Sequence, residues 1–260
     1  MTCARCGFAS PTSWDRCPSC AAPAGAAPRV PVDCLAKPTP RLRDGATGEP
    51  VGLLGAIVVG LLSALALLTL IQATGELKSA QAISSGDLDA SSVRGLLNTT
   101  ATLSFVIGIS GIVAFFVWLV RAVRNAEAFG VVMPRYRGGW VVGNWFIPVL
   151  GLWRPKRTME DAWRGSGGAP TSVIGWWWGL LVIAFYPLPI LVALAIGAHA
   201  NSRGDFQLMG FADLLTAVVW AGTAYLVDHI TRLQEPVLRA ARPAVPESAA
   251  TPVAGSLVTV

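Results

Sequence analysis

Four cysteines near the N-terminus are the residues best suited to chemistry. Cys3 and Cys6 are separated by two residues, and Cys17 and Cys20 repeat that spacing. A pair of thiolates at this spacing can hold a metal ion from one tight turn, and two pairs complete a tetrahedral site. The alternative is two disulfides, which require an oxidising compartment. We favour a structural Zn²⁺ ion, and because four protein ligands leave no open coordination position, we expect no catalysis at the metal.

Outside this cysteine module, few side chains have the types or the spacing of a catalytic site. His199 and His229 are the two histidines, and they fall near opposite ends of long apolar segments, so they cannot share one haem between those segments. Asp213 is a carboxylate inside such a segment, where an ionisable group is a candidate for function. A hydrogen-bonded or snorkelling Asp213 is the alternative. We predict that the protein is not an enzyme.

The elements that position these residues are expected to be membrane helices. Charged residues make up 13% of the chain and hydrophobic residues 53%. A soluble domain carries about 25% charged residues, so the composition excludes a soluble globular protein, and the apolar content excludes a disordered one. About 20 apolar residues cross the hydrocarbon core as a helix. The segments that meet this requirement are 52–74, 100–122, 174–198 and 207–229.

The stretch 138–153 is uncharged but too short to cross as a helix. It would reach about 24 Å, against a core of about 30 Å. We expect a cytoplasmic re-entrant or interfacial segment between the second and third helices, followed by a short interfacial helix over 155–165. Asn144 lies in this stretch, and because an unpaired buried amide costs a few kcal/mol, we favour a structural hydrogen bond over a ligand contact.

We therefore predict an all-α integral membrane protein with four transmembrane helices and a small N-terminal zinc ribbon. The ribbon covers residues 1–20 and a Pro/Ala-rich linker covers 21–50. The transmembrane domain covers 51–235, with a polar outer loop at 79–92, and a disordered Pro/Ala/Ser/Val tail covers 236–260.

The distribution of Lys and Arg predicts the orientation in the membrane. Of the 20 Lys and Arg residues, 17 fall in the N-terminal 50 residues, around the loop between the second and third helices, or in the C-terminal part. The three exceptions are Lys78, Arg94 and Arg203. The positive-inside rule then places both termini in the cytoplasm, where thiols stay reduced and zinc is favoured over disulfides. The net charge of +5 is explained by this signal and by contact with the lipid bilayer, so we predict no nucleic-acid partner.

Most of the ten tryptophans are concentrated in one part of the chain. Those between 140 and 178 are Trp140, Trp145, Trp153, Trp163, Trp176, Trp177 and Trp178. Indole prefers the headgroup region, where its ring is in an apolar environment and its N–H is hydrated. We predict that these side chains are anchors at the inner membrane interface, with an aromatic ligand cage as the alternative.

Prolines and small residues predict how the helices bend and pack. Pro187 and Pro189 lie inside the third helix, where each removes a hydrogen-bond donor, so we expect a kink that serves as a packing bend or as a gating hinge. Gly52, Ala56 and Gly60 are spaced four residues apart on the first helix. We expect them to pack inside the bundle, with a dimer face, and hence a homo-oligomer, as the alternative.

Several motifs in the central part of the chain resemble one known family. They are Arg121-x-x-Arg124-Asn125-x-x-x-x-Gly130, Trp140-x-x-x-x-Trp145-Phe146-Ile147-Pro148, Leu152-Trp153-x-Pro155 and Trp176-Trp177-Trp178. Over residues 51–235 the chain resembles the actinobacterial membrane-protein family named domain of unknown function 4328. The resemblance implies an integral membrane protein, commonly with an N-terminal zinc ribbon, and it brings no established activity. Proteins of this general type look like septation or envelope-assembly factors.

Two functional hypotheses follow, with a membrane enzyme as the third. The first is a non-catalytic scaffold or adaptor of the cytoplasmic membrane, whose zinc ribbon recruits a cytoplasmic or membrane protein partner in envelope assembly or cell division. The second is a small transporter or channel component that uses Asp213 and the kinked third helix.

Overall fold

The computed structural model describes residue 15 and residues 40–43, 45–85, 90–198 and 203–241. The chain divides into a unit of residues 1–39 and a unit of residues 40–260, of which the second contains nearly all of the described residues. The predicted zinc ribbon, most of the linker and residues 242–260 of the predicted tail lie outside them. The prediction that the disordered tail begins at 236 is wrong, because residues 236–240 continue the helix Arg203–Ala240 and Leu238 is buried. In the part of the chain that is described, every regular element is a helix.

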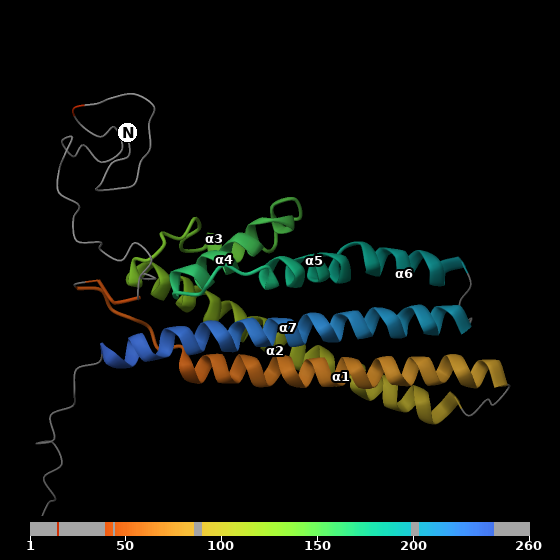
Figure 1. Ribbon diagram of the computed structural model, residues 1–260. Coiled ribbons are helices and arrows are strands. Elements are labelled where there is room, and N and C mark those ends of the chain that lie inside the picture. The colour runs from red at the N-terminus through yellow and green to blue at the C-terminus, as the bar shows by residue number, and fades with distance from the viewer. Residues whose placement is uncertain (1–14, 16–39, 44, 86–89, 199–202, 242–260) are drawn as a thin grey trace, which may run out of the picture. The chain divides into compact units, whose positions relative to one another are not determined.

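Long apolar helices form the bundle (Figure 1). The helices are α1 (Gly52–Ser85), α2 (Ala90–Phe129), α5 (Val173–Phe185), α6 (Pro187–Ala198) and α7 (Arg203–Ala240). Short elements connect α2 to α5: α3 (Trp140–Gly143), the 3-10 turn η1 (Leu150–Leu152) and α4 (Arg154–Gly165). Four segments are long and apolar enough to cross a membrane, namely Gly52–Ala82, Thr99–Phe129, Val173–Leu194 and Phe206–Ala240. The all-helical prediction and its four spans are confirmed at this level.

The helices are longer than the predicted spans. We placed the end of the first span before Glu76, but α1 has 34 residues and continues to Ser85. The prediction of a polar loop over 79–92 is wrong, because serine hydroxyls there donate to carbonyls of their own helix, such as Ser79 Oγ to Gly75 O at 2.9 Å. At a rise of about 1.5 Å per residue, α1 is about 51 Å long and exceeds the hydrocarbon core.

The third span is broken at the predicted place. Helix α5 ends at Phe185, Tyr186 leaves the helical geometry with φ −113° and ψ −73°, and α6 begins at Pro187. Tyr186 N still donates to Val182 O at 3.1 Å. Pro187 has no N–H to offer the next carbonyl, so the helix cannot continue straight. The predicted kink is confirmed, and its role as a hinge stays a prediction.

Helices α1 and α7 run antiparallel along their whole lengths. Gly55 faces Thr231 near one end of the pair, and Gly210 faces Leu77 near the other. Without a hydrophobic force between helices inside lipid, close backbone approach at small residues is a main source of attraction. The small-residue prediction was wrong for Ala56 and Gly60. Ala56 is exposed, and nothing lies within 4 Å of the position of a Cβ at Gly60.

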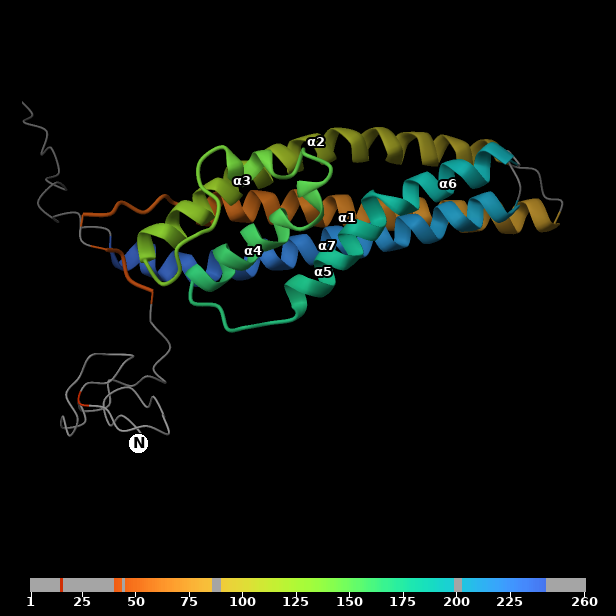
Figure 2. The ribbon, with the colours of Figure 1, turned by 90° about the horizontal axis from the view of Figure 1, so that it is seen from above.

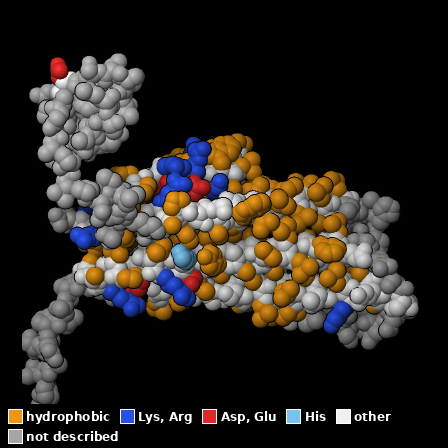
Figure 3. Space-filling view, in the orientation of Figure 1, with side chains coloured by type: hydrophobic (Ala, Val, Ile, Leu, Met, Phe, Trp, Pro, Cys, Tyr) orange, Lys and Arg blue, Asp and Glu red, His pale blue; other side chains and the backbone are white. Residues whose placement is uncertain are grey.

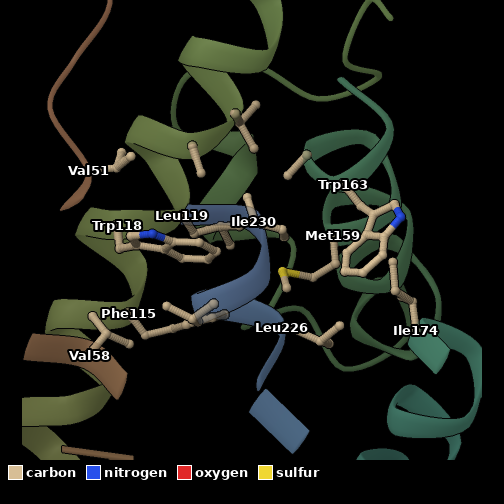
Figure 4. Close-up of a cluster of buried hydrophobic side chains, with 14 of the residues drawn as sticks. Val51, Val58, Phe115, Trp118, Leu119, Met159, Trp163, Ile174, Leu226 and Ile230 are labelled. Carbon is tan, nitrogen blue, oxygen red and sulfur yellow. The ribbon is translucent and has the colours of Figure 1, made fainter. Parts of the chain in front are cut away.

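A contiguous core joins α1, α2, α4 and α7 at one end of the bundle (Figure 4). Trp118 of α2 is fully buried, and its indole N–H donates to Thr231 Oγ1 of α7 at 3.0 Å. Met159 of α4 is equally buried, and Leu226 and Ile230 of α7 are buried with it. The connection between α2 and α5 is therefore part of the core, and Figure 2 shows α3 and α4 lying over this end of the bundle.

The outer surface of the bundle is apolar over most of its length. Phe105 is 69% exposed on α2, and Leu194 is 68% exposed on α6. Figure 3 shows hydrophobic side chains over the length of the helices and most of the visible charged side chains toward the end that carries α3 and α4. An apolar surface of this extent fits a hydrocarbon solvent, which supports contact with the lipid bilayer.

The segment 40–51 packs on the bundle, although residues up to 50 were predicted to be a linker without a core. We call it the strap. Arg43 N donates to Ala128 O at 3.1 Å at the end of α2, and the next turn contains Gly130 with φ +69°. Val51 is fully buried in the core. The strap satisfies a terminal carbonyl of α2, which explains why a Pro-rich composition did not leave it extended in solvent.

The contact between Gly55 and Thr231 predicts the result of two matched substitutions. A Cβ at Gly55 would lie 2.5 Å from Thr231 Oγ1, so Gly55→Ala should push α1 from α7 and lower the free energy of unfolding by about 1–3 kcal/mol. Gly60→Ala on the same helix meets open space and should be neutral or stabilising by up to about 1 kcal/mol. Thermal unfolding of the two variants in detergent measures the difference. Equal unfolding temperatures would contradict the assigned helix interface.

Candidate functional site

The predicted zinc ligands lie outside the described residues. Cys3, Cys6, Cys17 and Cys20 therefore stay a prediction from spacing alone. The candidate sites that the structure does describe are in the transmembrane unit. They comprise a polar network and an aromatic cavity at the end that carries α3 and α4, and a pair of carboxylates in the other half of the bundle.

The polar network is centred on Gln234 of α7, which is fully buried. Its amide nitrogen donates to Ala122 O of α2 at 2.9 Å and to Ser166 Oγ at 2.8 Å, directly after α4. Its amide oxygen accepts from Asn125 Nδ2 at 3.0 Å. One side chain thus joins α7, α2 and the end of α4, and the hydrogen bonds remove the desolvation penalty of a buried amide.

The same network holds the strap. Asn125 Nδ2 donates to Glu49 O at 2.9 Å, and Glu49 N donates to Asn125 Oδ1 at 2.8 Å. The Glu49 carboxylate accepts from Arg124 Nη1 at 2.8 Å and lies 3.5 Å from Arg121 Nε. A carboxamide that bonds both the N–H and the C=O of one residue fixes the backbone there. The strap is therefore tied to α2 by geometry that a flexible linker would not have.

Helix α4 has the amphipathic character that the sequence predicts. Met159, Ala162 and Trp163 are buried, and Lys156 pairs on the outer face with Glu160 at 3.6 Å. The Trp163 ring stacks on His229 of α7 with 4.5 Å between ring centroids. The helix therefore seals the bundle end with one apolar face and presents charges on the other.

Asp161 is the buried charge of α4. Its carboxylate accepts from Arg135 N at 2.9 Å and lies 3.7 Å from Arg135 Nε. Burial raises the pKa of the Asp161 carboxyl above its ordinary value, although the backbone N–H and the guanidinium of Arg135 act in the opposite direction. These contacts fix the loop between α2 and α3 against α4.

Asn144 directly follows α3 and is fully buried. Its Oδ1 accepts from Arg154 Nη1 at 3.3 Å, while its Nδ2 has no hydrogen-bond partner among the described residues. The Arg154 guanidinium also lies over the rings of Tyr136 and Trp140, at 5.3 Å and 5.9 Å from their centroids. Asn144 therefore orients Arg154, as a structural hydrogen bond would, and keeps an unused donor.

The seven predicted tryptophan anchors fall into different environments. Trp163, Trp177 and Trp178 are buried in protein, and each indole N–H donates to a protein oxygen, that of Trp177 to Thr223 Oγ1 at 2.9 Å. Trp145 is partly buried within the aromatic cluster described next. The exposed members are Trp140, Trp153 and Trp176, of which Trp176 is 75% exposed. Because Trp163, Trp177 and Trp178 are buried in protein, their indoles cannot reach lipid headgroups. Only the exposed side chains are accessible as interface anchors.

An aromatic cavity of about 390 Å³ opens between α2, the segment around α3 and η1, and helices α5 and α7. Its wall is mostly aromatic and includes Phe115, Phe116, Trp145, Phe146, Trp178 and Trp220. Trp145 contacts Phe115, Phe116 and Trp178 edge to face, with ring centroids 5.5–5.7 Å apart. Such contacts make the wall rigid, and its volume lies in the range of sites for small apolar ligands.

Asp213 does not share a site with Asn144. Its carboxyl group is close enough to that of Glu76 on α1 for the two groups to interact electrostatically, and both side chains are partly buried. Sequence reasoning missed Glu76 because the first span was ended before it. Gln72, one turn before Glu76 on α1, accepts from Ser104 Oγ at 3.2 Å.

Sequence reasoning also missed Gln234, although a signal for it exists. Ile230, Gln234 and Leu238 follow one another at four-residue spacing, so they share one face of α7, and all are buried. An amide between two apolar residues on a helix face is expected to be satisfied inside the protein. The pattern of charged residues does not reveal this, because Gln is uncharged.

A comparison with protein families shows the family of the chain. The family model for the domain of unknown function DUF4328 matches residues 79–232. The chain belongs to the DUF4328 family. The match runs from within α1 to within α7 and contains α3, α4 and most of the cavity wall. The family description gives no activity, and no curated protein and no solved structure matches the chain.

The network predicts that Gln234 stabilises the bundle while a nearby exposed polar residue does not. Gln234→Met removes the bonds to Ala122 O and Ser166 Oγ and leaves one N–H of Asn125 Nδ2 without an acceptor, so it should lower the free energy of unfolding by about 1–3 kcal/mol. Arg232→Gln removes an ion pair with Asp228 on the exposed side of the same helix. This substitution should change the free energy of unfolding by only about 0–1 kcal/mol. Chemical unfolding in detergent compares the two. A Gln234→Met protein as stable as Arg232→Gln would mean that the network is not structural.

Proposed function

We propose that the protein is a non-catalytic scaffold of the cytoplasmic membrane, with both termini in the cytoplasm. In this proposal the four-span bundle is the anchor, and the N-terminal cysteine module, folded around one structural Zn²⁺ ion, recruits a protein partner. Some actinobacterial membrane proteins of this general type look like septation or envelope-assembly factors, so we propose a partner in envelope assembly or cell division.

The attachment of the strap to the bundle carries this proposal. Glu49 is held by backbone hydrogen bonds to Asn125 and by ion pairs to Arg121 and Arg124. Because the strap is fixed in this way, the chain that precedes it starts from a defined place on the bundle.

The strap also shortens the tether between the cysteine module and the bundle. Residues 21–39 separate Cys20 from the strap, and at about 3.5 Å per residue they span at most about 65 Å. A zinc ribbon on such a tether would sample a limited volume near the inner surface, where it meets partners at a high effective concentration. This arrangement suits recruitment better than release of a diffusible module.

Zinc content and partner capture test the proposal together. The purified chain should contain about one zinc ion, and Cys17→Ser should lose it because three thiolates leave the tetrahedral site incomplete. Cys34→Ser is the matched control, since this lone cysteine is outside the two pairs and should keep both the zinc and the partner. Crosslinking in cells followed by purification identifies the partner. A Cys17→Ser chain that captures the same proteins would overturn recruitment by the module.

The pair formed by Glu76 and Asp213 favours one alternative, a small transporter or channel component. Two partly buried carboxyl groups, one on α1 and one on α7, could bind a proton or a cation. The break at Tyr186 would then let α6 move relative to α5.

Flux through reconstituted protein separates this alternative from the scaffold. In vesicles that contain a pH-sensitive dye, Asp213→Asn should abolish a proton flux that the wild type supports. Asp228→Asn, which alters an exposed pair elsewhere on α7, should not change it. The absence of flux from the wild type would remove the alternative and leave the scaffold.

A further inference from the structure

We propose that the protein holds one anionic phospholipid in a defined site, with a hydrocarbon chain in the aromatic cavity and the phosphate beside Arg121 and Arg124. This goes beyond the scaffold proposal and does not depend on it. The inference rests on two neighbouring hollows with complementary chemistry, which share the side chain of Phe116.

The first hollow, the aromatic cavity, fits a hydrocarbon chain. Its wall is apolar apart from a few atoms such as the hydroxyls of Tyr186 and Thr223, and Thr223 Oγ1 is already engaged by Trp177 Nε1. Ile112, at its edge on α2, is 42% exposed, so the cavity is reachable from the apolar surface of the bundle. Since most of the residues of the wall belong to the membrane-spanning segments, the molecules available to fill the cavity are lipids.

The second hollow, of about 360 Å³, is also lined by Phe116. Its other lining residues are apolar side chains of α2 and α3, namely Val117, Val120 and Val142, and the charged side chains Arg121, Arg124 and Glu49. We call it the arginine hollow. Apolar side chains next to charged ones suit the junction between a lipid chain and its headgroup.

The charge of the arginine hollow selects an anion. Arg121 and Arg124 face the single carboxylate of Glu49, so one positive charge is left over. Each guanidinium has five N–H donors, and the contacts to Glu49 and to Pro50 O among the described residues use only part of them. The two side chains are 37% and 60% exposed, which leaves them accessible to a phosphate.

The spacing along α2 joins the two hollows into one site. Phe116 and Arg121 are five residues apart on the helix, which corresponds to about 7.5 Å along its axis. A phosphate at Arg121 would therefore lie about one helical turn and a half beyond the ring that borders the cavity. A phospholipid bridges such a distance with its glycerol and the first atoms of its chain, whereas free phosphate would occupy the arginine hollow alone.

Native mass spectrometry of the full chain with defined lipids tests the site. The protein in detergent is mixed with equal amounts of phosphatidylglycerol and phosphatidylcholine, and the lipid that stays bound is counted. We expect the wild type to retain phosphatidylglycerol in preference. Ile112→Trp, which fills the cavity edge, should lower retained phosphatidylglycerol by about threefold or more, equivalent to ~0.7 kcal/mol. Val113→Trp is the matched control, because Val113 is exposed on the same helix but does not line the cavity.

The headgroup is tested by the double variant Arg121→Gln and Arg124→Gln. It should lose the preference for phosphatidylglycerol over phosphatidylcholine while it still binds either lipid through the cavity. Glycerol 3-phosphate, added in excess, should not displace the bound lipid, because it supplies the phosphate without the chain.

Three results would overturn the proposal. Equal retention of the two lipids by the wild type would exclude an anion site. Equal retention by Ile112→Trp and Val113→Trp, with both proteins unfolding at the wild-type temperature, would exclude a chain in the cavity. Displacement by glycerol 3-phosphate would show a site for phosphate alone.

Discussion

Inside a bilayer, apolar surfaces gain little by meeting one another, so helices must be joined by close packing and by hydrogen bonds between side chains. In this protein, Gln234 meets that requirement at the end of the bundle where four elements converge. Its carboxamide connects α7 to α2, to the end of α4 and, through Asn125, to the strap. Two indoles add further connections, since Trp118 and Trp177 donate to threonine hydroxyls of α7. These contacts join helices that line the aromatic cavity and the arginine hollow.

Composition and charge were sufficient to predict the four spans, because a run of apolar residues without charges has one stable environment. Local chemistry was also sufficient for the break at Pro187 and for the buried face of α4, since both follow from residue type and spacing. The ends of the helices were not predictable from charge. Helix α1 continues through Glu76 because its length is set by packing against α7, and the bilayer does not end a helix at its boundary.

Contacts between distant parts of the chain could not be predicted from one sequence. Nothing local distinguishes Gly55, which faces α7, from Gly60, which faces outward. The sequence predicts that Trp177 is an interface anchor, because nothing in it shows that Thr223 lies beside the indole and accepts its N–H. The Pro-rich composition of the strap predicts a linker. It does not show that a side chain of α2 binds the backbone of the strap. For the predicted zinc ligands the situation is reversed. Their spacing in the sequence is informative, but the four cysteines lie outside the described residues.

The strap has a mechanical consequence. It is attached by the bond from Arg43 N to Ala128 O and by the bonds around Glu49, and these would bear any tension applied to the N-terminal region before the core of the bundle does. If they opened, residues 40–50 would join the tether and lengthen it by about 35–40 Å, while the helices stayed folded. The protein would then yield to a pulling force by extension, and it would regain its original length when the force ceased and Asn125 rebound the segment.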